Sequence, residues 1–131
     1  MKTTEMTRRK FGSVRFRFLG VGYQGRLLVS KYATGNDRVD LEIRTAYKTW
    51  EPYAQLSVDV PSLYVPEGSF IARDWGVQKG LVQALQGKHL RVSSRITYPY
   101  QGSHLPVVKW ARSFDKSGTA LGGKDTGPSP Q

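Results

Sequence analysis

Residues 11–32 read FGSVRFRFLGVGYQGRLLVSKY, and this stretch decides the class of fold. Its first part alternates between polar side chains and apolar ones, the apolar ones being Val14, Phe16 and Phe18. A period of two residues is typical of a strand with one buried face. The glycines at 20, 22 and 25 indicate a turn, and the apolar run Arg26–Tyr32 follows as a second strand. We therefore expect a hairpin here.

The same glycines match the string G-x-G-x-x-G of dinucleotide-binding turns, from Gly20 to Gly25. In that motif the third glycine opens a helix whose N-terminus faces the pyrophosphate. In this chain a strand-like run without helical spacing follows instead. We therefore prefer a hairpin loop to a dinucleotide site.

The rest of the chain predicts further short strands. A turn is expected at Ala33–Asp37 and a break at Trp50–Pro52, since Gly and Asn adopt positive φ readily and Pro cannot donate to a ladder. Apolar runs predict strands over Val39–Arg44, Tyr53–Val60, Phe70–Ala72, Leu90–Tyr98 and Leu105–Ala111. Asp40 and Glu42 make the solvent face of one strand acidic, so this strand can pair with an arginine-bearing neighbour.

One short helix is expected near residues 75–86. Its apolar stripe has helical spacing and consists of Val77, Leu81, Val82 and Leu85. Asp74 has the profile of the N-cap and Gly87 that of the C-cap glycine. The order of elements predicts an α+β fold, mainly an antiparallel β-sheet of about six to seven strands with the helix on one sheet face.

Length and composition fit one domain of 131 residues without cysteine. The lack of cysteine excludes disulfides, thiolate nucleophiles and cysteine-ligated metals. We expect a flexible basic arm at residues 1–10, a folded domain at 11–113 and a disordered Gly/Ser/Pro tail at 114–131. No apolar leader follows the start of the chain and no apolar run is long enough to cross a bilayer, so we expect a cytoplasmic protein without a membrane partner.

The net charge of +10 is unevenly distributed. Residues 1–31 carry eight basic side chains and one acidic side chain, and residues 88–112 carry five basic side chains and no acidic one. Residues 32–87 carry five basic and seven acidic side chains. Two basic blocks therefore flank a mildly acidic one, a pattern that indicates an anionic partner.

Two pairs of arginines, Arg15 with Arg17 and Arg91 with Arg95, each lie on one face of a predicted strand. If both strands share one exposed sheet face, they form an arginine field beside the basic arm. Guanidinium groups suit phosphate, and the resulting affinity is sensitive to salt. The candidate nucleic-acid-binding residues are Arg8, Arg9, Lys10, Arg15, Arg17, Arg91, Arg95, Lys109 and Arg112.

Aromatic residues offer two further hypotheses. Four rings near the basic positions could stack on unpaired bases, although rings in β proteins usually pack in the core; they are Tyr23, Tyr98, Tyr100 and Trp110. Three others form an alternative patch for contact with a protein partner; they are Tyr47, Trp50 and Tyr53.

Catalytic candidates are few. His89 and His104 lack the spacing of metal ligands, and we expect ordinary surface histidines. Asp37, Asp40 and Glu42 form the densest acidic group; the last two could hold Mg²⁺ through water, but we prefer a solvated face paired with arginines. No Walker A, G-x-S-x-G or Ser-Lys motif is present. We therefore expect no enzyme, no cofactor and no metal.

Glu51–Pro61 reads EPYAQLSVDVP and resembles the GEPYA-x-L-[ST]-V-N-[LIV]-P segment of a family of small bacterial proteins of unknown function. Members of that family occur on plasmids, phages and integrated elements. Phe70–Trp75 with Gly80–Leu85 is similar to the family's next block, and Arg95–Tyr100 to its closing strand. The resemblance covers about residues 24–110, and Asp59 stands where the family usually has Asn.

The resemblance implies an accessory protein of a mobile element and brings no mechanism. Together with the charge, it predicts a non-enzymatic protein that binds DNA, RNA or a host nucleoprotein through basic strands. The alternative is a protein-directed inhibitor of a host defence system, of the anti-CRISPR or anti-restriction type.

Overall fold

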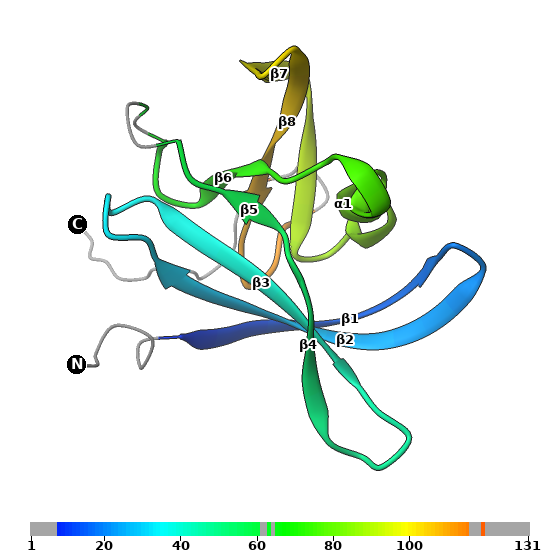
Figure 1. Cartoon of the computed structure of the whole chain (residues 1–131). Coiled ribbons are helices and arrows are strands. Elements are labelled where there is room, and N and C mark those ends of the chain that lie inside the picture. The colour runs from blue at the N-terminus through cyan, green and yellow to red at the C-terminus, as the bar shows by residue number, and fades with distance from the viewer. Residues whose placement is uncertain (1–7, 61–62, 64, 116–118, 120–131) are drawn as a thin grey trace, which may run out of the picture.

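A computed structural model describes residues 8–60, 63, 65–115 and 119. Its strands run mainly antiparallel (Figure 1). They are β1 (Arg9–Phe18), β2 (Val21–Lys31), β3 (Asp37–Arg44), β4 (Trp50–Gln55), β5 (Ser57–Val58), β6 (Ser69–Ala72), β7 (Leu90–Tyr100) and β8 (Ser103–Trp110). The 3₁₀ turn η2 (Gly76–Gln78) precedes the helix α1 (Leu81–Leu85). The predicted antiparallel fold with one short helix is confirmed.

The strands divide into two sheets of four. Sheet 1 has the order β1-β2-β3-β4, and sheet 2 has the order β5-β6-β8-β7. The main core contains side chains of both sheets and of α1, among them Leu27, Leu41, Phe70, Leu85 and Val108. Three hairpins, β1–β2, β3–β4 and β7–β8, extend from this core in different directions (Figure 1). The helix contacts β1 and β7 and thus closes one end of the core.

The β1–β2 hairpin confirms the preference for a hairpin loop over a dinucleotide site. Its turn consists of Leu19 and Gly20, whose φ angles are 53° and 82°. Two positive φ values characterise the type I′ turn, which matches the twist of a hairpin. A leucine in the left-handed region costs about 1 to 2 kcal/mol relative to a residue that tolerates it. Gly22 and Gly25 lie inside β2, so the turn is narrower than predicted.

The expected break at Trp50–Pro52 and the expected single strand Tyr53–Val60 are wrong. Pro52 lies inside β4, and β4 is an edge strand where a missing N–H is tolerated. The strand pattern ends at the fully buried Leu56, whose N–H donates to Val39 O (2.8 Å) and whose carbonyl accepts from Arg73 N (2.7 Å). At this residue the chain crosses from sheet 1 to sheet 2.

The helix is shorter than predicted, because Gly80 at φ 88° separates α1 from η2. Asp74 is not its N-cap, although its Oδ1 accepts a hydrogen bond from Gly80 N at 2.8 Å. Val77 lies in η2 and is 92% exposed, so it does not belong to the buried stripe. Gly87 is not a left-handed cap, since Gln86 ends the helix with extended backbone.

The ends of the folded region differ slightly from the prediction. Arg9 and Lys10 already pair with β2, so β1 begins within the predicted arm. At the other end, Phe114 N donates to Lys88 O at 3.2 Å, which places the start of the predicted tail against the domain. Residues 1–7, 116–118 and 120–131 of the predicted arm and tail lie outside the described residues. No helix in the described part of the chain is long and apolar enough to cross a membrane.

Side chains satisfy three amides of β7, an edge strand of sheet 2. The Oε1 atom of Gln86 accepts a hydrogen bond from Val92 N at 2.7 Å. Ser93 Oγ accepts from Arg95 N and Ile96 N, at 3.3 and 3.0 Å, where the register with β8 shifts. These amides therefore have partners without a further strand.

Asp37 connects the two sheets. The turn predicted at Ala33–Asp37 is present, but Asp37 itself is the buried first residue of β3. Its carboxylate pairs with Lys31 of β2 through Oδ1. The Oδ2 atom accepts hydrogen bonds from Gly68 N (2.9 Å) and from Trp110 Nε1 of β8 (2.8 Å). One buried carboxylate thus holds donors from both sheets.

We predict that Asp37→Asn lowers the free energy of unfolding by about 2 to 4 kcal/mol, because the amide loses the charge and places a donor among three donors. Urea unfolding at pH 7, followed by tryptophan fluorescence, measures the effect. Glu67→Gln is the matched control, since Glu67 is 83% exposed and lies 3.9 Å from the same Lys31. Its change should stay below about 0.5 kcal/mol, and equal losses in the two variants would contradict the role of Asp37.

Candidate nucleic-acid interface

The outer face of sheet 1 is the face opposite the core. On β1 the predicted alternation holds, with Phe16 buried and both Arg15 and Arg17 exposed. The register places Arg15 opposite Gln24 and Arg17 opposite Gly22 of β2. Arg17 donates to Gly20 O at 3.0 Å across the turn. Among the described residues, no hydrogen bond or ion pair engages the side chain of Arg15.

The outer face continues over β3 and β4 with residues that the sequence analysis missed. Arg26 lies opposite Glu42 and forms an ion pair with it at 2.7 Å. Arg44 lies opposite Trp50. The guanidinium carbons of Arg26 and Arg44 lie 4.5 and 5.3 Å from the centroid of the Trp50 ring. Two cations therefore lie against one aromatic ring, the geometry of cation–π contacts.

The charges on this face are unevenly balanced. Toward the β1–β2 hairpin, this face carries four arginines, Arg15, Arg17, Arg26 and Arg44, and one carboxylate, Glu42, which pairs with Arg26. At the far end, Asp40 is buried and is bonded by Arg38 at 3.1 Å and by Arg8 at 3.4 Å. The acidic strand face thus pairs with arginines, which is the arrangement we preferred over Mg²⁺ ligands. No group of three or more possible metal ligands occurs in the described ranges.

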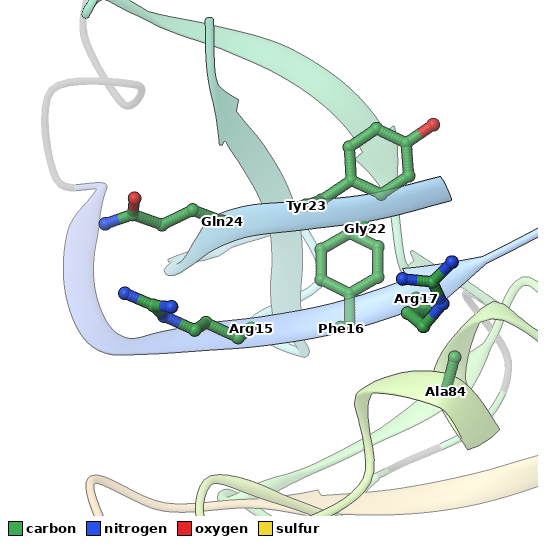
Figure 2. A pocket seen from close by; sticks show the side chains of 7 residues that line it. All are labelled: Arg15, Phe16, Arg17, Gly22, Tyr23, Gln24 and Ala84. Carbon is green, nitrogen blue, oxygen red and sulfur yellow. The ribbon is translucent and has the colours of Figure 1, made fainter. Parts of the chain in front are cut away.

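An open hollow of about 590 Å³ lies at the β1–β2 hairpin, next to α1. Its lining residues are Arg15, Phe16, Arg17, Gly22, Tyr23, Gln24 and Ala84. Figure 2 shows that Arg15 and Gln24 extend side by side from neighbouring strands, whereas Arg17 lies near Ala84 of the helix. Guanidinium and amide groups are thereby offered to solvent along the hairpin.

The second basic block lies on a different sheet. Arg91 and Arg95 belong to β7 of sheet 2, so they do not share a sheet face with Arg15 and Arg17. The condition for a single arginine field is therefore not met; alternation within a strand leaves it open, because it does not reveal which strands pair. Arg91 is also engaged internally, since it donates to Asp115 O at 3.1 Å and lies 5.1 Å from the Phe114 ring centroid.

The other predicted phosphate contacts are distributed over both sheets. Lys109 lies opposite Arg91 on β8, and Arg112 follows this strand; both are exposed. Arg9 and Lys10 are exposed at the start of β1. Of these four residues, Arg9 and Lys10 belong to the same sheet as Arg15 and Arg17, whereas Lys109 and Arg112 do not. Arg8 precedes Arg9 in the chain, and its side chain bonds Asp40 of β3.

The four candidate stacking rings are packed against other rings or the core. Tyr23 lies 5.0 Å from both Phe16 and Tyr53, centroid to centroid. Burial, with the neighbouring Tyr23, raises the pKa of Tyr53 to about 12. Tyr98 and Tyr100 pack on the smaller core of sheet 2, and Trp110 lies 4.7 Å from Phe11. These contacts favour core packing over stacking on bases.

The three residues of the alternative protein-contact patch face different surroundings. Tyr47 is 88% exposed in the loop between β3 and β4. Trp50 lies between arginines on the outer face, and Tyr53 packs on the inner aromatic rings. They therefore do not assemble into one patch.

The histidines also have different surroundings. His104 is exposed on β8, as expected. His89 is buried, contrary to the prediction of a surface position: its Nδ1 lies 3.3 Å from Ala111 O, and its ring meets Phe11 edge-on. A Cβ at Gly12 would lie 2.5 Å from the His89 ring, so this glycine lets β1 approach the histidine.

No protein-family model matches the chain, and neither curated proteins nor solved structures show a significant similarity to it. The resemblance of Glu51–Pro61 therefore stays a prediction, and a function has to be argued from the residues themselves.

We predict that Gly12→Ala lowers the free energy of unfolding by about 1 to 3 kcal/mol, because the added methyl group collides with a buried ring that cannot move freely. Thermal and urea unfolding measure the loss. Gly87→Ala is the control, since a Cβ at Gly87 meets nothing within 4 Å. A Gly12 variant as stable as this control would show that His89 is free to move.

Proposed function

We propose that the protein binds nucleic acid through the outer face of sheet 1 and acts as a binding module rather than a catalyst. The observation that carries the proposal is a sheet face with four arginines, Arg15, Arg17, Arg26 and Arg44, of which only Arg26 pairs with a carboxylate, that of Glu42, among the described residues. Phosphate groups spaced along a strand would supply the negative charge that this face lacks.

The arrangement of the arginines supports phosphate as the ligand. Arg15 and Arg17 are two residues apart on one strand face, and Arg26 and Arg44 lie against the same ring of Trp50. Like charges this close repel each other, and an arriving polyanion relieves the repulsion. Guanidinium groups also bind phosphate oxygens with two parallel hydrogen bonds.

The second basic block has a separate role in this proposal. Arg95, Lys109 and Arg112 belong to sheet 2 or follow it, away from the outer face of sheet 1. Their charge adds to the long-range field of a chain with a net charge of +10. We expect this field to accelerate association at low salt without contacts to the same phosphates.

The biological setting rests on a different argument. The resemblance of Glu51–Pro61 to proteins of plasmids and phages supports an accessory role in a mobile element. Binding of nucleic acid is consistent with such a role, and the outer face supports it independently of the resemblance.

Two variants with equal loss of charge test the proposal. R15Q/R17Q/R44Q removes three exposed arginines of the outer face, and R95Q/K109Q/R112Q removes three exposed cations of the other block. We predict that the first variant lowers the slope of log affinity against log salt by about 2 to 3 units for duplex DNA. The second should lower it by less than about 1 unit.

Fluorescence anisotropy with labelled DNA and RNA, from low to physiological salt, measures both slopes. Circular dichroism shows whether each variant is folded. Equal losses for the two variants would refute the outer face as the site, and absence of binding at low salt would refute nucleic-acid binding altogether.

A further inference from the structure

The turn at the tip of the β1–β2 hairpin carries an unusual residue. Leu19 is 79% exposed and has a φ of 53°, and the neighbouring Val21 is 49% exposed. The β7–β8 hairpin has the same kind of turn, with Gln101 and Gly102 at φ 49° and 83°. Glycine and asparagine are the usual residues at such positions. A leucine that is both backbone-strained and exposed to water indicates a functional demand on this tip.

The tip is carried by a two-stranded ribbon. The pairing of β2 with β3 ends at Gly25 and Ile43, so residues 15–24 extend beyond β3. Phe18, on the core side of the ribbon, approaches Gly80 just before α1. Arg15, Arg17 and Gln24 are exposed, and together with Ala84 of α1 they line the open hollow (Figure 2). The ribbon therefore projects cations along one face and an apolar side chain at its end.

These features match the requirements of a groove of duplex DNA. Grooves admit two-stranded β-ribbons, and the two arginines are separated by about 7 Å, the rise of two residues in a strand. This is about the rise of two base pairs, of about 3.4 Å each, along the helix axis of DNA. Proteins that enter the minor groove use arginine there and insert leucine or similar apolar side chains between base pairs, which kinks the duplex.

A single strand fits the described surface less well. Binding of unpaired bases relies on exposed rings, and Tyr23, Tyr98, Tyr100 and Trp110 are packed internally. Trp50 is in contact with two arginines. Tyr47 is the exposed exception, and it lies on a different hairpin.

We infer that the β1–β2 hairpin enters the minor groove of duplex DNA, where Arg15 and Arg17 contact phosphates and Leu19 wedges between neighbouring base pairs and bends the duplex. This inference rests on the proposed function and specifies its ligand as double-stranded DNA.

Cyclisation of a linear DNA fragment by ligase tests the wedge without knowledge of a preferred sequence. A fragment shorter than the persistence length of about 150 base pairs closes slowly unless a protein bends it. We predict that the wild-type protein accelerates closure at least about tenfold, and that Leu19→Asn abolishes most of this acceleration while affinity changes less than about threefold, because the phosphate contacts remain.

Leu19→Asn is chosen because asparagine tolerates the left-handed conformation, so the turn is kept and the melting temperature should not fall. Gln101→Asn is the matched control in the equivalent turn of β7–β8, and it should bend DNA as the wild type does. If Leu19→Asn melts at a lower temperature than the wild type, Leu19→Gly is measured as well, because glycine also tolerates the left-handed conformation. The inference then requires that Leu19→Gly shows the same loss of bending.

Three results would overturn the inference and leave the proposed function intact. These are bending by Leu19→Asn equal to that of the wild type, binding of the wild type to duplex DNA without accelerated closure, and tighter binding to single strands or duplex RNA than to duplex DNA. Absence of binding to any nucleic acid would instead show that the proposed function itself fails.

Discussion

The buried carboxylate of Asp37 is the interaction on which the arrangement of the two sheets depends. It forms an ion pair with Lys31 of β2. It also accepts hydrogen bonds from Gly68 N, in the segment before β6, and from Trp110 Nε1 of β8. A carboxylate away from water is stable only with such donors around it, so its position fixes theirs. Trp110 in turn packs on Phe11 at the start of β1, 4.7 Å away, so the constraint extends along β1 toward the hairpin.

Because the inner face of sheet 1 is occupied by the core, only its outer face is available to a partner. The two acidic residues that β3 places on the outer face, Asp40 and Glu42, then decide where positive charge remains. Asp40 pairs with Arg8 and Arg38 at one end, and Glu42 pairs with Arg26 nearer the other. Both ends of the outer face therefore keep an excess of arginine over carboxylate, and the arginines beyond β3, Arg15 and Arg17, have no carboxylate beside them among the described residues. An excess of one charge along a face attracts a polyanion over a distance.

Alternation in the sequence was sufficient to predict most strands, because one buried face imposes a period of two on each of them. It failed at Leu56, where alternation continues although the strand ends, because the crossing is decided by hydrogen bonds to Val39 and Arg73 far along the chain. The candidate site was predicted only in part, because alternation shows which side chains share one face of a strand but not which strands lie beside it. Arg15 and Arg17 follow from alternation within β1, whereas Arg44 was hidden in a segment of net negative charge and joins them only through the pairing of β2, β3 and β4.

Pro52 in β4 affects how copies of the molecule associate with one another. A free sheet edge is a template to which strands of other molecules can add, and proteins protect such edges with proline or with local side-chain bonds. Pro52 removes a donor from the edge of sheet 1, and Gln86 and Ser93 occupy amides at the edge of sheet 2. These features protect β4 and β7, each of which is one of the two edge strands of its sheet, so that strands of other molecules add to them less readily.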